Sequence, residues 1–267
     1  GGNGRGMPGA NEAAGGLGLE SAFDPNRTLI ESPPLVRSMR QWFSRRYLDL
    51  LGSIYIYNEH RGYTAIDRVL EAVRARWPDD YVLIARIEKH RADERKHYMM
   101  FRRWFERRGF MPFAIDRTFG HIDRFVEIMF GSPIDEIDPV RIIGRQKWFE
   151  RMCRVISLTE KRGHRQVEIL LRHPIVRSDL TLMRIFRIIE KDEPSHWAPY
   201  DDWLRAHGCR QPSWWERAID MFIHRELLFL KLPLLFVLPG LKRRQSWADD
   251  LDQVDYGTGV TAVAAQG

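Results

Sequence analysis

The sequence predicts an all-α protein built around a four-helix bundle with one long crossover connection. Strand signals are scarce, since no run of residues alternates convincingly between apolar and polar side chains. Apolar residues recur instead at helical spacing over long segments, and Gly, Pro and Asp punctuate the chain between them. These segments form two helical hairpins joined through residues 109–138, which is the connectivity of such a bundle.

An additional N-terminal helix is expected over residues 34–51, where apolar side chains recur at helical spacing. The first hairpin begins with a helix over 53–77, which carries Glu59. A turn at 78–80 follows, because proline breaks the helix and aspartate is a good N-cap. The second helix of this hairpin ends at Gly109.

The second hairpin follows a crossover that contains one short helix over 122–130. Its first helix is expected over 139–172, which carries Glu160 and ends where Pro174 follows. Its second helix starts near Ser178, a plausible N-cap, and runs to residue 207.

The chain is expected to divide into four regions. Residues 1–31 form a Gly-rich disordered N-terminus, 32–211 the helical bundle, 212–245 an apolar and basic C-terminal helical segment, and 246–267 a disordered tail.

Composition constrains the class of protein and its location. The 267 residues carry a formal net charge of +6, which permits an anionic membrane or nucleic acid as partner. The arginines are spread over most of the predicted helices, which is typical of solvated helix faces and does not favour nucleic acid. With two cysteines and no visible signal peptide, we expect no disulfide framework and a cytoplasmic protein, with peripheral contact on the inner face of the membrane as a further option.

A paired motif provides the main functional signal. Asp93-Glu94-Arg95-Lys96-His97 has a near copy at Asp192-Glu193-Pro194-Ser195-His196, and each is an acidic residue followed by Glu-x-x-His. On a helix, residues three apart lie on one face, so each copy directs a carboxylate and an imidazole the same way. Pro194 lies inside the second copy and is expected to kink its helix.

Each copy has a glutamate at the same height on the neighbouring helix. Residues level with one another in an antiparallel hairpin are about equally far from its turn. Glu59 and Glu94 are almost equidistant from the turn at Pro78, and Glu160 and Glu193 from the turn between residues 174 and 178. Four carboxylates and two imidazoles buried together need compensating positive charge, which two divalent iron ions supply.

This arrangement resembles the ferritin-like di-iron carboxylate superfamily, in particular its oxygen-activating branch. The resemblance covers about residues 50 to 207. It implies two iron ions held by six ligands and O2 as co-substrate, with an external electron donor such as a reductase or ferredoxin. It also implies that Asp93 and Asp192 hydrogen-bond the ligand histidines. The implied ligands are Glu59, Glu94, His97, Glu160, Glu193 and His196.

Three further residues lie one helical turn from these ligands. His90 precedes Glu94 and could line the site or act as an additional ligand. Glu190 lies in the helix of the second motif and His164 follows Glu160, and both could line the site beside the ligands.

The resemblance implies a monooxygenase-type enzyme that hydroxylates, desaturates or otherwise oxidises an apolar substrate such as a lipid, quinone or isoprenoid. Two alternatives stay open: a ferritin- or rubrerythrin-like ferroxidase or peroxidase, and a non-catalytic helical binding module. The apolar run at 227–241 is flanked by tryptophans and by a basic cluster at 242–244. Residues 214–247 therefore either lie in a membrane interface or cover the bundle or another subunit.

Overall fold

The computed structural model describes residues 34–250, so the predictions of disorder for residues 1–31 and 251–267 lie outside the described residues. The chain divides into two units, residues 1–40 and residues 41–267. Among the described residues, the first unit holds only the start of helix α1. The description below concerns the second unit.

The described part of the chain is all-helical, as the sequence predicts. Between residues 34 and 250 there is no strand, and a single isolated bridge pairs Phe113 with Arg243. The elements are α1 (Pro34–Arg76), α2 (Tyr81–Arg108), η1 (Arg117–Phe119), α3 (His121–Phe130), η2 (Ile134–Glu136), α4 (Pro139–Gly144), α5 (Gln146–Arg172), α6 (Pro174–Ser178), α7 (Leu180–Asp192), α8 (Pro194–Ala206), α9 (Trp214–Glu226), the π-helix η3 (Leu227–Lys231) and α10 (Leu232–Val237).

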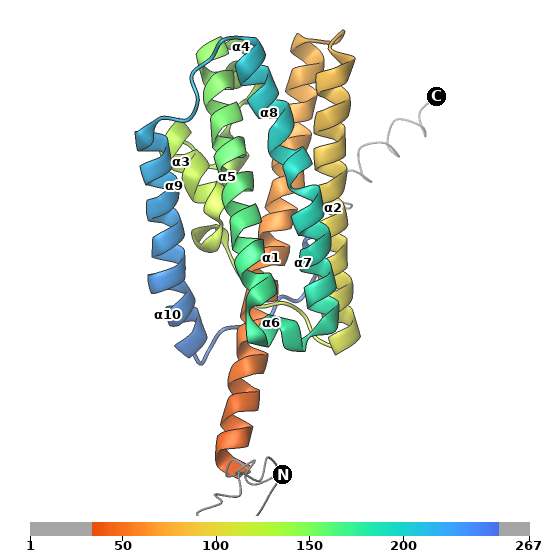
Figure 1. The fold of residues 1–267 in the computed structure, drawn as a ribbon, viewed down its shortest axis with the longest axis vertical. Coiled ribbons are helices and arrows are strands. Elements are labelled where there is room, and N and C mark those ends of the chain that lie inside the picture. The colour runs from red at the N-terminus through yellow and green to blue at the C-terminus, as the bar shows by residue number, and fades with distance from the viewer. Residues whose placement is uncertain (1–33, 251–267) are drawn as a thin grey trace, which may run out of the picture. The chain divides into compact units, whose positions relative to one another are not determined.

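Helices α1, α2, α5 and the consecutive pair α7–α8 form a helical bundle (Figure 1). Its core consists of two apolar clusters. One joins the 66–73 stretch of α1 to the start of α2, the start of α5 and the end of α8. The other joins the 48–63 stretch of α1 to the second half of α2, the end of α5 and α7. The predicted ligands occupy the level between the two clusters, so polar side chains are enclosed by apolar layers on both sides.

The expected break near residue 52 is wrong, because α1 is one continuous helix. Ser53 does not cap a new helix: its hydroxyl donates to the Asp49 carbonyl one turn earlier, at 2.6 Å. Gly52 is a point of close packing, since a Cβ there would lie 2.6 Å from the Trp104 ring. The glycine that resembles a helix breaker in the sequence therefore lets α2 approach α1.

The predicted turns of the first hairpin and the crossover are present. Asp80 caps α2 by accepting from the Leu83 amide, and Gly109 ends α2 with a φ of 74°. The helix predicted over 122–130 is α3. The helix predicted over 139–172 is divided at Arg145 into α4 and α5.

The second hairpin differs from the prediction at its turn and at its motif. Ser178 ends the short helix α6, and Asp179 caps α7 by accepting from the Leu182 amide. Pro194 ends α7 and starts α8, with Glu193 at the junction. Because proline has no N–H, the hydrogen-bond ladder is interrupted, and the His196 amide bonds the Glu193 carbonyl three residues back at 2.9 Å.

The C-terminal segment is helical, as expected, in α9, η3 and α10. A capping box of Ser213 and Glu216 starts α9. No helix within residues 34–250 combines the length and the apolar character needed to cross a membrane.

The first residues of the predicted disordered tail, up to residue 250, pack on α2. Buried Asp249 accepts hydrogen bonds there from Tyr98 and Arg102.

Candidate metal centre

The structure brings the six predicted ligands together inside the bundle. Glu59 comes from α1, Glu94 and His97 from α2, Glu160 from α5, Glu193 from the α7–α8 junction and His196 from α8. His97 and His196 are fully buried, and three of the four glutamates are at most 8% exposed. Glu160 is partly exposed. Charged side chains at this depth require strong compensation.

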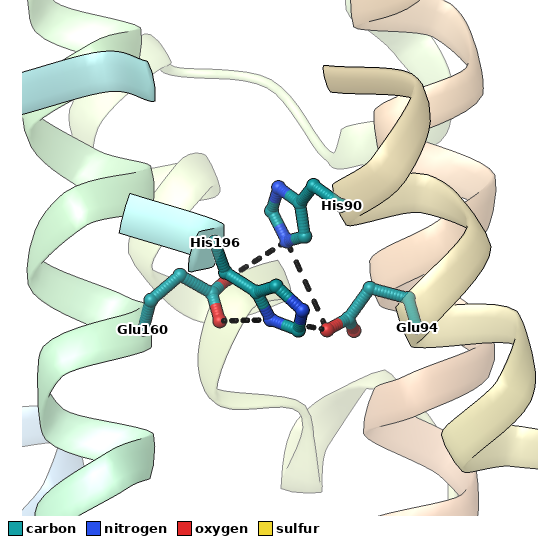
Figure 2. Close-up of side chains that lie close together, drawn as sticks. All are labelled: His90, Glu94, Glu160 and His196. Atoms are coloured by element: carbon teal, nitrogen blue, oxygen red, sulfur yellow. Dashed lines mark ion pairs between the residues drawn. The ribbon is translucent and has the colours of Figure 1, made fainter. Parts of the chain in front are cut away.

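The ligand atoms form two compact groups that could each hold a metal ion and that share Glu94. One group consists of Glu59, Glu94 and His97. The other consists of His90, Glu94, Glu160 and His196, whose ring nitrogens and carboxylate oxygens face one another (Figure 2). A carboxylate common to two groups is the arrangement by which a glutamate bridges two metal ions.

His90, which the sequence suggested only as a possible additional ligand, belongs to one of the two ligand groups. It is 1% exposed, and its Nε2 lies 3.8 Å from Glu94 Oε1 and 3.7 Å from Glu160 Oε1. Its ring stacks on that of His196, with the centroids 4.4 Å apart. The centre therefore offers three imidazoles.

Each imidazole directs one nitrogen into the cluster and the other toward an outer partner. His97 Nε2 lies 3.0 Å from Asp192 Oδ2, and His196 Nε2 lies 3.5 Å from Asp93 Oδ2. The acidic residue of each motif thus faces the histidine of the other motif. His90 Nδ1 lies 3.2 Å from the hydroxyl of Tyr200, which is fully buried. Such outer partners fix the tautomer and the orientation of metal-binding imidazoles.

Lysines hold the two outer aspartates. Lys96 Nζ lies 2.6 Å from Asp93 and 2.7 Å from Asp192, so it links the two motifs, and Lys89 also pairs with Asp93. Burial raises the pKa of Asp192, but hydrogen bonds from His97 and Lys96 outweigh it and lower that pKa to about 2. Contacts with His196, Lys89 and Lys96 likewise outweigh burial and lower the pKa of Asp93, so both aspartates are ionised at neutral pH.

The inner carboxylates repel one another. Burial and the neighbouring Glu59 raise the pKa of Glu94 to about 7. Burial and Glu160 raise the pKa of Glu193 well above its ordinary value. For Glu160, burial acts in the same direction, but contact with His196 and His90 lowers its pKa to about 2. Without a cation, protons must balance part of this charge.

The imidazoles of His97 and His196 are protonated and so balance part of the negative charge of the inner carboxylates. Burial lowers the pKa of His97, but Asp192 and Glu59 outweigh it and raise that pKa to about 9. The pKa of His196 is likewise raised well above its ordinary value, because contacts with Asp93, Glu160 and Glu94 outweigh burial. Burial and the neighbouring His196 lower the pKa of His90 to about 3.

Several buried atoms at the centre lack a hydrogen-bond partner. They are His90 Nε2, His97 Nδ1, Glu193 Oε2 and both ring nitrogens of His196. His97 Nδ1 lies 3.3 Å from Glu59 Oε2, in a geometry that is not that of a hydrogen bond. Unpaired buried polar atoms are rare in proteins and expensive, and a metal ion would satisfy those that face the cluster with a lone pair. The imidazole and carboxylate set suits divalent iron and related ions.

Gly62, one helical turn after Glu59, makes room for the shared carboxylate. A Cβ at this position would lie 2.2 Å from Glu94 Oε2. Only hydrogen at this position leaves the carboxylate in place. By contrast, a Cβ at Gly163 would lie 3.5 Å from Glu193 Oε1, an ordinary contact.

Metal binding is expected to release protons. His97 and His196 are protonated in the metal-free protein at pH 7, because their pKa values are raised, and both must lose that proton to bind a metal ion. Titration of metal-free protein with Fe²⁺ or Zn²⁺ in weakly buffered solution at pH 7 should release more than two protons per chain: one from each of these imidazoles and part of one from Glu94, whose pKa is about 7. The overall constant for binding both ions should then fall at least about a hundredfold per pH unit on acidification. Release of no protons would contradict this charge state.

Replacing Asp192 with asparagine is expected to weaken metal binding without unfolding the protein. Asparagine keeps the shape of the side chain but removes the charge that orients His97. The loss should be about 10- to 100-fold in affinity, as for comparable outer partners. Competition with a chromophoric chelator measures it. Asp202, a half-exposed aspartate of α8 that pairs with Arg86, is the matched control: Asp202→Asn should leave the affinity unchanged.

Of the six predicted ligands, Glu193 belongs to neither group, although its Oε2 lies 3.8 Å from His196 Nδ1. The remaining candidates also lie outside both groups. Glu190 is half-buried on α7, and His164 on α5 packs against the Trp197 ring, with the centroids 5.4 Å apart. Sequence reasoning did not identify Tyr200, Lys96 or Gly62. Tyr200 lies one turn after His196 and Gly62 one turn after Glu59, so helical spacing from the ligands was the available signal.

A cavity of about 110 Å³ opens onto the centre. Ten of its fifteen lining residues are polar or charged, among them Glu59, Glu94, Glu160, Glu193 and His121. A second cavity of about 90 Å³ shares Gly62, Ile122 and Glu160 with the first. Apart from these and Arg68, its walls are apolar, with Val69, Val126, Met152 and Ile156 among them.

Comparisons with models of known protein families, with curated proteins and with solved structures gave no match for this chain. Its classification therefore depends on the residues described above.

Proposed function

We propose that this protein is a ferritin-like di-iron oxidoreductase, which uses O2 and electrons from an external donor to oxidise an apolar substrate. The observation that carries the proposal is the pair of buried ligand groups sharing Glu94, next to a first cavity that shares lining residues with a second, apolar cavity. Imidazole and carboxylate ligands with free coordination positions suit iron that binds oxygen. Iron bound there would supply the binding and reduction of O2.

The residues of the chain supply position and protection. Three imidazoles held by Asp93, Asp192 and Tyr200 fix the geometry of the ligands. The two apolar clusters on either side of the ligand level keep bulk water away from them.

The two cavities suit an amphiphilic substrate. Its apolar part would lie between α1, α3 and α5 in the apolar cavity, and its polar part among the polar residues of the first cavity. Gly62 and Glu160 line both cavities, so the substrate bond nearest their junction lies beside the ligands. This arrangement supports hydroxylation or desaturation at one position of an apolar chain.

Filling the apolar cavity tests this proposal. Ala65 lines that cavity on α1, and Ala65→Phe should lower substrate-dependent O2 consumption at least about tenfold while leaving the iron content unchanged. The assay uses reduced, iron-loaded protein with fatty acids, isoprenoids and quinols as trial substrates. The exposed Ala85 on α2 gives the matched control, Ala85→Phe. Iron without O2 reactivity in the wild-type protein would overturn the proposal.

A ferroxidase is the second candidate, because the polar cavity opens directly onto the four glutamates of the centre, which would meet Fe²⁺ that enters it. The two functions differ in iron stoichiometry. Continued Fe²⁺ oxidation beyond two ions per chain, unaffected by Ala65→Phe, would support the ferroxidase over the oxygenase.

A further inference from the structure

Large apolar side chains are exposed along the outward face of α9, η3 and α10, from its first residue to its last turn. Trp214 is 76% exposed, Phe229 78% and Val237 71%. Most of the exposed apolar positions fall in pairs, 214/215, 221/222, 229/230 and 237/238, and pairs seven or eight residues apart lie on the same side of a helix, so they form one stripe. Trp215, Met221, Phe222, Leu230, Leu234 and Leu238 belong to the same surface. We call these nine residues the apolar face.

The fold does not need this surface. The opposite side of the same segment already packs on the protein: Ile223 lies in a core cluster with α3 and α5, and Leu235 in a cluster with α1. Figure 1 shows α9 and α10 at the edge of the bundle, beside α3. A segment that only covered the bundle would have one apolar side, and this segment has two.

The apolar face continues onto α1. The Phe236 ring contacts Phe43, with centroids 4.5 Å apart, and Trp42, with centroids 5.8 Å apart. Trp42 and Phe43 are themselves 59% and 50% exposed. Arg46 donates hydrogen bonds to the Leu235 and Leu238 carbonyls, which anchors the end of α10 on α1.

The acidic residues of this segment are at least partly buried, whereas its exposed charged residues are basic. Its acidic residues point inward: Glu216 pairs with Arg154, Asp220 with Arg162 and Glu226 with Lys231. None of the acidic residues between 211 and 245 is exposed. The exposed charged residues of the same stretch are Arg217, Arg225 and Lys242.

We propose that the apolar face docks on an anionic membrane surface, with the segment lying in the plane of the interface. Exposed tryptophans with basic residues and no exposed acid match the chemistry of an anionic lipid headgroup layer. A second copy of the chain is a poorer partner, because a two-fold contact through this surface would bring arginines of the same sign together.

Docking would place lipid next to the metal cavity. Leu227 of η3 is buried and lines the polar cavity, while Phe229 and Leu230 of the same π-turn face outward. The segment thus separates the ligands from the proposed membrane by its own thickness. This consequence rests on the proposed function, whereas docking itself does not.

Vesicle flotation at about 0.1 M salt tests the docking. The full chain should float with phosphatidylcholine vesicles that contain phosphatidylglycerol, and less with phosphatidylcholine alone. Phe229→Glu/Leu234→Glu should lower the partition coefficient at least tenfold, because two outward apolar contacts become charged. Arg217→Glu/Arg225→Glu should lower it at least about fivefold per charge removed, and only on the anionic vesicles.

The matched control is Val82→Glu/Ile169→Glu, which charges two equally exposed apolar side chains on α2 and α5. It should leave flotation unchanged. Thermal unfolding and metal content of all variants should equal those of the wild type, which separates docking from the metal centre. The proposal is overturned if the wild type binds neither vesicle, if the control variant loses binding equally, or if Phe229→Glu/Leu234→Glu converts a dimer to a monomer in light scattering without lipid.

Discussion

Glu94→Ala is expected to remove both metal ions from the protein. Glu94 is the only residue common to the two ligand groups found among residues 34–250, so its loss removes one carboxylate from each group and the only ligand that could link them. Affinity at both positions should fall more than about a hundredfold, beyond the effect of losing an outer partner. Metal analysis after gel filtration measures the loss.

Two companion variants make this result specific. Glu59 belongs to one group only, so Glu59→Ala should leave about one metal ion per chain. Glu88 is an exposed residue of the same helix, and Glu88→Ala should keep both ions. The metal-free Glu94→Ala protein should be no less stable to urea than the metal-free wild type, because burial disfavours the charged form of Glu94 and raises its pKa to about 7. Equal metal content in Glu94→Ala and Glu88→Ala would contradict the shared-ligand arrangement.

Gly62→Ala is expected to abolish high-affinity metal binding through a single methyl group. That methyl would lie 2.2 Å from Glu94 Oε2, so the carboxylate must rotate away from the position in which it faces both groups. We expect a loss of at least about a hundredfold in affinity. The metal-free protein should be as stable as the wild type or up to about 1 kcal/mol more stable, because alanine is favoured over glycine inside a helix.

Gly163→Ala is the control for Gly62→Ala. It adds the same methyl group on the facing helix α5, at an ordinary 3.5 Å from Glu193. Chelator competition should give wild-type affinity for Gly163→Ala. If both alanine variants bind metal like the wild type, Glu94 does not serve as the shared ligand.

The sequence identified the level of the ligands because turn positions determine height in a hairpin. Pro78 and Pro174 sit close to the turns, and these two positions were enough to pair Glu59 with Glu94 and Glu160 with Glu193. The break of the helix at Pro194 also followed from the residue type, since proline cannot continue the hydrogen-bond ladder.

Other features depend on packing and could not be read from spacing. Asp93 faces His196, and Asp192 faces His97, because of how α2, α7 and α8 are rotated about their axes. The inner position of His90 depends on the same rotation. The continuity of α1 through Gly52 depends on the approach of Trp104, a residue of another helix.

Anomalous diffraction at the iron edge, from crystals of the wild-type protein loaded anaerobically with Fe²⁺, tests the metal centre most directly. The ligand groups predict two peaks a few ångströms apart on either side of Glu94, one beside His97 and Glu59 and the other beside His90, Glu160 and His196. Absence of iron between these side chains, or a single ion that does not contact Glu94, would contradict the two-metal arrangement.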